Sequence, residues 1–237
     1  ADGSTEKVTE SVKPDGSSEK QTEIVSADGS TEKVTESVKP DGSSEKQTEI
    51  VSDDGSTEKI TEKTKPNGSS EKVTDIEKPN GATIHEEVKT TAKGKETSQK
   101  IETSASGSVK ITEQVKQPSG DQSKVVMKKT GENSVAIKQA VTTAKNGKIT
   151  IPKTVKVNGK KLKVTALKKN FLKGSETKPK KITINATDIT KIAKGAFNGI
   201  AKKATIEVKA GKKDYKRIQK LIKNSGISRG VKIKRIK

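Results

Sequence analysis

This chain of 237 residues has few of the side chains that carry out chemistry. It has no cysteine and no tryptophan, and its one histidine is His85. Thiol nucleophiles and Cys/His metal clusters are therefore excluded, and a lone histidine on a polar segment is usually a surface residue. We expect no catalytic residues, no metal site and no cofactor, and hence a protein that is not an enzyme.

Aromatic and aliphatic residues are also scarce. The only aromatic residues besides His85 are Phe171, Phe197 and Tyr215, and hydrophobic residues make up 27% of the chain. A segment as polar as residues 1–130 lies near the compositional limit of disorder, so a flexible spacer is one interpretation of it. The sequence contains no recognisable transmembrane run, signal peptide or wall-anchoring tail. Because it opens on a repeat boundary without an initiator Met, we expect a mature segment or fragment of a longer protein.

Glycine, by contrast, follows a strict order through residues 1–130. A turn-like triplet such as Pro14-Asp15-Gly16 recurs every thirteen residues, and the block 1–26 reappears unchanged as 27–52. A disordered spacer has no need of such turns, whereas β-hairpins do. The pattern predicts alternating up and down strands. The glycines of the period are Gly3, Gly16, Gly29, Gly42, Gly55, Gly68, Gly81, Gly94, Gly107 and Gly120.

Two strand registers are compatible with these turns. If Asp15-Gly16 is a two-residue turn, Lys7 faces Ile24 and apolar residues fall on both faces of the sheet. If Pro14-Asp15-Gly16 is a three-residue loop, a type I turn with Gly in the left-handed bulge position, the pairing moves by one residue. Opposed residue numbers then sum to 30 across the first turn and 56 across the second. We favour the three-residue loop because it pairs opposite charges.

In that register, charged and β-branched side chains form rows across the strands. Opposite charges and β-branched pairs each contribute roughly 0.2–1 kcal/mol, so rows shared by six strands stabilise a sheet without a deep core. One row is Lys7, Glu23, Lys33, Glu49, Lys59 and Asp75, a second is Glu10, Lys20, Glu36, Lys46, Glu62 and Lys72, and a third is Val8, Thr22, Val34, Thr48, Ile60 and Thr74.

The predicted fold of residues 1–130 is therefore a repetitive antiparallel single-layer β-meander of up to ten strands, roughly 45 Å long. In its composition and Asp-Gly turns it resembles, by architecture only, the single-layer sheet of spirochaete outer surface proteins. The rows become irregular after Lys78, although the turns persist. The Asp-Gly turns also suggest calcium loops, but they lack the further spaced ligands that calcium requires.

The composition changes near residue 131, where we place a boundary. Residues 1–130 carry 20 Lys and Arg against 25 Asp and Glu, whereas residues 131–237 carry 30 against 5. Residues 131–148 are expected to form a connecting strand or hairpin. Within them, 134–146 has both helical and alternating spacing, and we favour a strand that Asn146-Gly147 joins by a hairpin to 148–151.

Residues 149–237 carry a different repeat. Ile182-Thr183-Ile184, Ile189-Thr190-Lys191-Ile192 and Gly195-Ala196-Phe197-Asn198-Gly199 resemble a BspA-type leucine-rich repeat, and 149–174 resembles a less regular first copy in which Asn170 stands where Ala is expected. The resemblance implies a leucine-rich-repeat cap domain, with Phe197 buried and Ile residues stacked between coils. The implied structural anchors are Phe171, Ile189, Ile192 and Phe197.

A strand at 205–208, a helix at about 214–224 and a last strand near 231–236 would close the stack. Lysines cluster on and beside that helix. Their simplest role is solubility, and their functional interpretation is docking to an anionic polymer. The candidate polyanion patch is Lys212, Lys213, Lys216, Arg217, Lys220 and Lys223.

Two functions follow from these features. The first is a non-enzymatic structural and adhesion protein, secreted or on a bacterial cell surface, whose repeat stalk presents the leucine-rich-repeat domain to a host or bacterial surface protein or an anionic polysaccharide. The location rests on the family resemblance. The second is a module that binds teichoic acid, glycosaminoglycan or extracellular DNA through its basic half. Sequence-specific nucleic-acid recognition is not expected, because Arg and aromatic residues are few.

Overall fold

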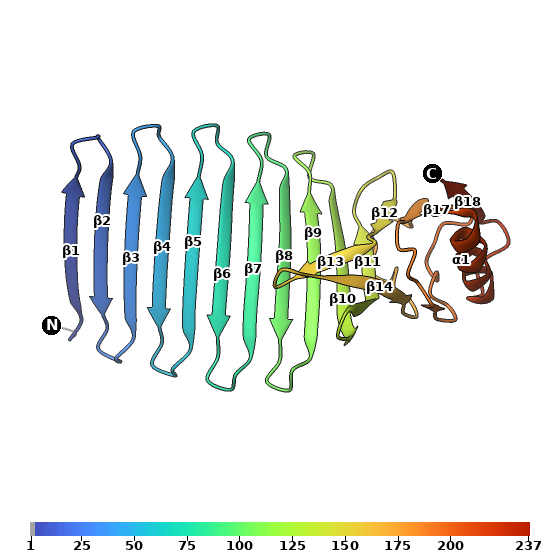
Figure 1. The fold of residues 1–237 in the computed structure, drawn as a ribbon, viewed down its shortest axis with the longest axis horizontal. Helices are drawn as coiled ribbons and strands as arrows, with labels where there is room; N and C mark the ends of the chain where they lie inside the picture. Colours follow the sequence, from blue (N-terminus) through green and yellow to red (C-terminus); the bar gives the residue numbers. More distant parts are fainter. Residues whose placement is uncertain (1–2) are drawn as a thin grey trace. The chain divides into compact units, whose positions relative to one another are not determined.

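The computed structural model describes residues 3–237, and these form eighteen strands and one helix (Figure 1). Fourteen strands make one sheet, in which β1 to β11 follow one another in chain order and are followed by β14 and β13, with β16 paired to β14. The order in the second sheet is β12-β15-β17-β18. The fold is mainly β, with a long antiparallel meander and one C-terminal helix, as the sequence predicts.

The elements of the meander are β1 (Thr5–Val12), β2 (Ser18–Val25), β3 (Thr31–Val38), β4 (Ser44–Val51), β5 (Thr57–Thr64), β6 (Ser70–Glu77), β7 (Thr83–Thr90), β8 (Glu96–Thr103), β9 (Val109–Lys116), β10 (Gln122–Gly131) and β11 (Ser134–Thr142). The later elements are β12 (Lys148–Ile151), β13 (Thr154–Val157), β14 (Lys160–Leu167), β15 (Lys181–Ile184), β16 (Lys191–Ile192), β17 (Thr205–Lys209), α1 (Lys212–Asn224) and β18 (Lys232–Ile236). The chain divides into two compact units, an N-terminal unit Ala1–Val109 and a C-terminal unit Lys110–Lys237. This division precedes the boundary expected at residue 131.

The turns of the repeat are three-residue loops. At the first, the Gly16 N–H donates to the Lys13 carbonyl at 2.9 Å and the Lys13 N–H donates to the Ser17 carbonyl at 2.8 Å. Gly16 has a φ of 84°, which is the left-handed conformation that a bulge requires and that glycine adopts at little cost. Asp15 completes the turn, because its Oδ1 accepts from the Ser17 N–H at 2.9 Å. The three-residue prediction is confirmed.

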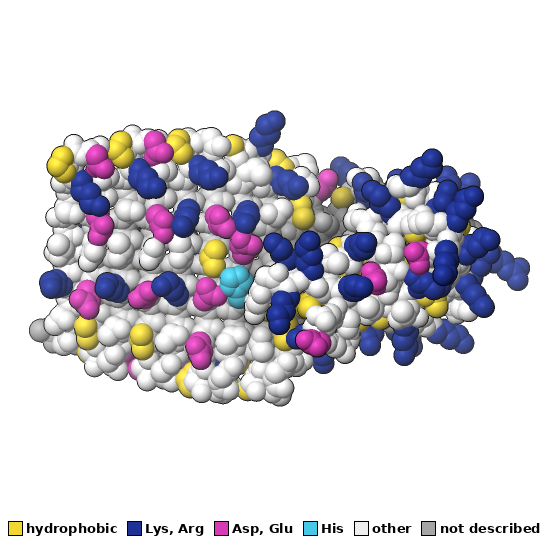
Figure 2. Space-filling model, in the orientation of Figure 1, with side chains coloured by type: hydrophobic (Ala, Val, Ile, Leu, Met, Phe, Trp, Pro, Cys, Tyr) yellow, Lys and Arg dark blue, Asp and Glu magenta, His cyan; other side chains and the backbone are white. Residues whose placement is uncertain are grey.

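The predicted register is confirmed with the turns. Lys7 lies opposite Glu23 in the β1–β2 pair, and Glu23 lies opposite Lys33 in the β2–β3 pair. Figure 2 shows the resulting alternation of basic and acidic side chains across the strands. The Lys7 row continues past Asp75 to His85, whose Nδ1 lies 2.6 Å from Asp75 Oδ1, an extension that the sequence interpretation missed. Ion pairs in these rows join Lys20 to Glu10 at 3.1 Å, Lys46 to Glu36 at 2.8 Å, Lys59 to Glu49 at 2.7 Å and Lys72 to Glu62 at 2.9 Å.

The N-terminal unit has almost no buried side chains. Among residues 3–109, only Thr48, at 7% exposure, and Ile101, at 4%, are buried, and Val12 is 78% exposed. Turn geometry, ladder hydrogen bonds and cross-strand pairs therefore hold this sheet, since little apolar surface is removed from water.

The C-terminal unit has a conventional core. It begins at β9, where Ile111 is fully buried, and β10 and β11 add Met127 and Ile137. Residues 134–142 are a strand, as favoured over a helix. The hairpin expected at Asn146-Gly147 is wrong: β10 and β14 occupy both edges of β11, so β12 pairs in parallel with β15 in the second sheet.

Parallel ladders show that the chain coils back on itself in this unit. Ile149, Ile182 and Ile206 are aligned in the second sheet, and their side chains are buried. Phe171 and Phe197 are also buried, with ring centroids 5.4 Å apart in an edge-to-face arrangement. Their burial agrees with the predicted role of both residues as anchors. Ile189 is buried as well, whereas Ile192 is half-buried.

Asn170 explains why the first coil is one residue shorter. Leu167 pairs with Ile192, so Asn170 aligns with Gly195 and not with Ala196. Both residues have positive φ, 56° for Asn170 and 71° for Gly195. Asparagine tolerates this left-handed conformation better than other residues with a side chain, so Asn170 takes the glycine position and Ala196 has no counterpart.

Two further elements complete the unit. The hairpin of β13 and β14 turns at Asn158-Gly159, whose φ values of 48° and 78° fit a type I′ turn, and it was not predicted. Helix α1 begins two residues before the expected Asp214 and buries Ile218 and Ile222. The expected last strand is β18, which pairs in parallel with β17.

Candidate functional site: a cationic surface on the C-terminal unit

Helix α1 carries its lysines on one face. At about 100° per residue, five lysines fall within an arc of roughly 100°, and the buried Ile218 and Ile222 lie on the opposite side. All five are exposed, and in the structure of residues 3–237 none has an acidic partner within 4.0 Å. The face thus presents uncompensated positive charge to solvent. Its lysines are Lys212, Lys213, Lys216, Lys220 and Lys223.

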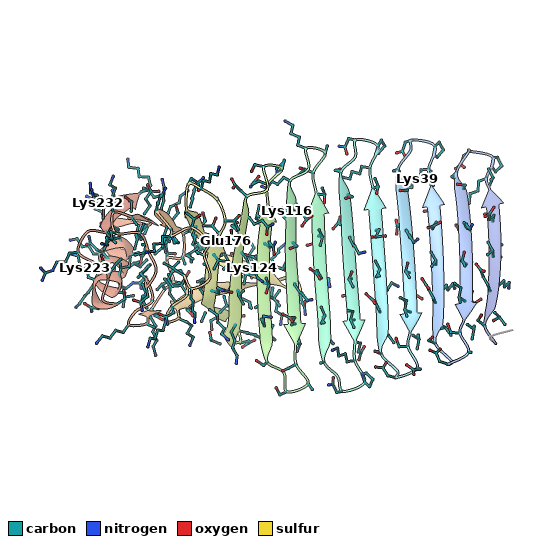
Figure 3. The ribbon with its side chains drawn as sticks, turned by 180° about the vertical axis from the view of Figure 1, so that it is seen from behind. Lys39, Lys116, Lys124, Glu176, Lys223 and Lys232 are labelled. Carbon is teal, nitrogen blue, oxygen red and sulfur yellow. The ribbon has the colours of Figure 1, made fainter. Side chains whose placement is uncertain are left out.

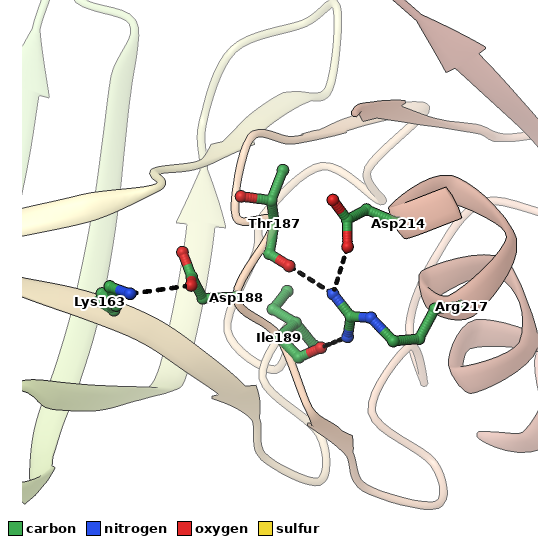
Figure 4. A network of polar contacts seen from close by, with 6 residues as sticks. All are labelled: Lys163, Thr187, Asp188, Ile189, Asp214 and Arg217. Atoms are coloured by element: carbon green, nitrogen blue, oxygen red, sulfur yellow. Dashed lines mark hydrogen bonds and ion pairs between the residues drawn. The ribbon is translucent and has the colours of Figure 1, made fainter. Parts of the chain in front are cut away.

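Arg217, the sixth member of the predicted patch, has a different role. Its guanidinium donates to the backbone carbonyls of Thr187 and Ile189 and lies 3.2 Å from Asp214 Oδ1 (Figure 4). These contacts fasten α1 to the loop between β15 and β16. A guanidinium already engaged by three acceptors has few donors left for an external anion, so we assign Arg217 to structure.

The outward face of the second sheet forms another basic area. Because strands alternate their side chains, Ile149, Ile182 and Ile206 point inward, and the preceding residue of each strand points outward. Adjacent strands are about 4.8 Å apart, so the basic groups follow one another at short intervals along the sheet. The outward row next to these isoleucines is Lys148, Lys181, Thr205 and Lys232, and the following row is Thr150, Thr183, Glu207 and Lys234.

Acidic residues do little to offset this charge. Beyond residue 130 there are five, and three of them are held in local ion pairs. Asp188 pairs with Lys163 at 3.2 Å, Glu207 with Lys181 at 2.8 Å, and Asp214 with Arg217. Lys223 and Lys232 extend away from the ribbon in Figure 3. The electrostatic field of this unit is therefore strongly positive, which favours anionic ligands.

Within residues 3–237, no three His, Asp or Glu side chains gather closely enough to hold a metal ion. An open hollow of about 380 Å³ beside β9 to β12 is lined by mixed groups, among them Glu113, Asp121 and Lys148. The one helix of the described chain is too short and polar to cross a membrane.

The sequence interpretation located the helix lysines and the basic residues that follow them, among them Lys232 and Lys234 of β18, but it missed Lys148 and Lys181 of the second sheet. The missing information was the parallel alignment of β12, β15 and β18, which lie in three separate parts of the chain. The sequence does contain a signal for this alignment: the tetrapeptide Lys-Ile-Thr-Ile occurs at 148–151 and again at 181–184. In a coiled repeat, segments with the same pattern lie side by side in successive coils.

Comparison with known proteins gives no relative: no family model, no curated protein and no solved structure matches the chain.

Proposed function

We propose that this is a non-enzymatic structural and adhesion protein that is secreted by a bacterium or displayed on its cell surface. In this proposal the repeat array is a spacer and the C-terminal unit binds the partner. The observation that supports a spacer is the construction of the N-terminal unit. Each strand repeats the previous pairing, one side chain among residues 3–100 is buried, and each added strand lengthens the sheet by about 4.8 Å. Such a sheet gains length without needing a larger core.

The resemblance of residues 149–237 to BspA-type leucine-rich repeats supports the binding role of the C-terminal unit. The stacked parallel strands and the buried Phe171 and Phe197 are compatible with such a repeat. On this proposal the partner is a surface protein or an anionic polysaccharide, and the cell surface is the site of action. The surface location rests on the resemblance.

The spacer proposal is tested by removing one exact repeat, residues 27–52. Since β2 and β4 have the same sequence, deletion joins β2 to β5 with the pairing that β4 makes. We expect the shortened protein to fold, to lose roughly 10 Å of sheet length, and to bind its ligand unchanged. Small-angle scattering and a binding assay measure these effects. Loss of binding would show that the array takes part in recognition.

The specific observation that favours the second candidate, a polyanion-binding module, is the lysine rows of the second sheet together with the free lysines of α1. We expect heparin to bind the full chain, with affinity that falls steeply as salt rises, because binding releases counterions. Triple replacement of Lys148, Lys232 and Lys234 by Ala should weaken binding. The matched control replaces Lys7, Lys33 and Lys59 of the array and should bind normally.

A salt series separates the two candidates. Binding that disappears between low and physiological salt supports the polyanion module, and salt-tolerant binding to one protein partner supports the adhesion domain. Heparin binding that is equal in both triple variants would locate the interaction outside the second sheet.

A further inference from the structure

The first eight strands of the array begin and end at one edge of the sheet. Thr5, the first residue of β1, lies opposite Val25, and Val25 lies opposite Thr31 at the start of β3. The same alignment continues to Thr103, the last residue of β8, and Figure 1 shows β1 beginning and β8 ending at the lower edge. Tension between these two ends therefore acts across the strands. The complete row is Thr5, Val25, Thr31, Val51, Thr57, Glu77, Thr83 and Thr103.

Tension in this direction acts on the residue pairs of a ladder one after another. The inter-strand hydrogen bonds of an antiparallel pair run perpendicular to the strands, so they lie parallel to the tension. In the β1–β2 ladder, the pair Thr5–Val25 takes the load first, followed by Glu6–Ile24. Tension along the strands would instead load all eight pairs of that ladder together. The ladders are therefore loaded in the direction in which they resist least.

No core resists the separation of neighbouring strands in this unit. Of residues 3–109, Thr48 and Ile101 alone are buried, and each strand from β1 to β8 pairs only with its neighbours in the chain. The ion pairs that cross the ladders are exposed, as for Lys20 and Glu10, and exposed pairs contribute at most about 1 kcal/mol. Opening one ladder therefore leaves the next ladder intact.

Each ladder that opens adds length to the array. The period is thirteen residues, which span roughly 45 Å when extended, whereas a paired strand occupies about 4.8 Å of the sheet. One opened ladder thus replaces a single strand spacing by a segment of chain about nine times as long.

The three-residue loops keep an opened strand close to its partner. Between β1 and β2, the Gly16 N–H donates to the Lys13 carbonyl, and the Ser17 N–H donates to Asp15 Oδ1. These bonds lie within five consecutive residues at the far end of the ladder from Thr5, so opening reaches them last. Hairpins with such local contacts form within about 1–10 μs. A detached strand should therefore pair again soon after the tension falls.

We propose that the N-terminal unit is an extensible tether. Tension across its strands opens a ladder pair by pair, and the strand pairs again when the tension falls. The inference rests on the spacer function proposed above and adds that the spacer lengthens under load. Such a tether would keep the C-terminal unit attached to its ligand while the distance between the two anchored ends changes.

The test pulls the full chain between two introduced cysteines, since the chain has no cysteine of its own. Asp53, Ala92 and Ala105 are each the exposed first residue of a three-residue loop. Asp53→Cys with Ala105→Cys places both attachment points at the same edge, about 19 Å apart across the strands. The matched control, Asp53→Cys with Ala92→Cys, places them at opposite edges, about 14 Å apart across the strands and about 27 Å along them. The control therefore loads the β5–β6 and β6–β7 ladders mainly along the strands.

Optical tweezers measure the force of the first opening and the length of chain released. We expect the variant with cysteines at 53 and 105 to open at a lower force than the control, in a first step of roughly 45 Å, and to close on relaxation. A second same-edge variant, Ala27→Cys with Ala105→Cys, should open at the same low force.

Same-edge variants that open at a force equal to or above that of the control overturn the proposal, as does an extension that does not reverse. The proposed spacer function fails in a different way. A rigid array would fail the pulling test and still be a spacer, whereas loss of ligand binding on deletion of residues 27–52 would contradict the spacer and leave the pulling result unchanged.

Discussion

The two units of this protein are both β structure, yet different interactions hold them. In the N-terminal unit, each strand pairs with its neighbours in sequence, and Thr48 is the one buried side chain among residues 3–100. In the C-terminal unit, Ile149 pairs with Ile182 from the next coil, and isoleucines and two phenylalanines fill a core. The comparison shows that a regular turn and a charge ladder define a sheet locally, whereas a coil depends on distant residues.

This difference predicts how damage spreads. In an array of nearly equivalent strands, stability is close to a sum of strand and interface terms, so one substitution has a limited effect. In the C-terminal unit the same core residues contact several coils, and one truncation weakens all of them.

The largest expected effect is that of Phe197→Ala. Phe197 is 3% exposed and contacts the ring of Phe171, so its truncation should lower the free energy of unfolding of the C-terminal unit by about 3–5 kcal/mol. Denaturant unfolding followed by the NMR signals of each unit measures the effect. The matched truncation Val12→Ala, at an exposed site, should change stability by less than about 0.5 kcal/mol. An unchanged C-terminal midpoint in the Phe197 variant would contradict the anchor role.

The next largest effect is expected at a turn. Gly68 has a φ of 78°, and a Cβ there would meet no atom within 4 Å, so Gly68→Ala has only a conformational cost, about 1 kcal/mol. The control is Gly211→Ala, where φ is −63° and the space is also open, so the backbone conformation itself costs nothing; any loss of stability there comes from its position as the N-cap of α1, where Ala is less favoured than Gly. Urea midpoints of both variants test this. Equal effects would show that the bulge conformation does not limit the array.

The array was predictable because its information is local and repeated. The triplet Pro14-Asp15-Gly16 determines the type and length of the loop, and the loop determines the strand register in which Lys7 lies opposite Glu23. Because residues 27–52 repeat residues 1–26 exactly, the same register has to account for both copies. Only the end of the pattern escaped this logic, where His85 continues the Lys7 row beyond Asp75.

The C-terminal unit was less predictable because its contacts join distant segments. Asn146-Gly147 has the sequence of a hairpin turn, but β11 already has neighbours on both edges, and no local signal reports that. Similarly, the sequence alone shows Arg217 only as one more cation on a basic helix. The structure shows that its guanidinium donates to the carbonyls of Thr187 and Ile189, which are distant in the sequence. Residue types identified the basic surface, and tertiary pairing decided which cations belong to it.

A smaller effect is expected from the ion pairs of the array. The Lys59 ammonium and the Glu49 carboxylate are 2.7 Å apart. Lys33 and Glu23 also lie opposite each other, but in the described part of the chain their charged groups do not form an ion pair within 4.0 Å. Double-mutant cycles to Ala should give a coupling of about 0.2–1 kcal/mol for Lys59–Glu49 and less for Lys33–Glu23. High salt should reduce both. Couplings of zero for each pair would mean that the charge rows select the register without stabilising it.

The smallest effect concerns acid. The Ser17 hydroxyl and the Ser17 N–H both donate to the Asp15 carboxylate. These bonds, the hydroxyl bond most strongly, hold the pKa of the Asp15 carboxyl below its ordinary value of 3.8. Asp28, Asp41 and Asp54 have lowered pKa values for the same reason, with Ser30, Ser43 and Ser56 as donors. A carboxyl with a lowered pKa in the folded state stabilises the fold above its unfolded pKa, and this stabilisation is lost as the pH falls through the folded pKa.

The array should therefore lose stability below about pH 4, where these turns begin to bind protons. The Lys46 and Lys59 ammonium groups likewise lower the pKa values of Glu36 and Glu49. These glutamates therefore also destabilise the array in acid, and the experiment must distinguish their contribution from that of the turn aspartates. Replacing the four turn aspartates by Asn does this, because Asn67 already accepts the Ser69 N–H at 3.0 Å in an equivalent turn. Hydrogen exchange of the array amides in both proteins, near neutral pH and near pH 3, measures the difference. The Asn variant should lose less protection in acid than the parent chain, and an equal loss would assign the acid sensitivity to the glutamate rows alone.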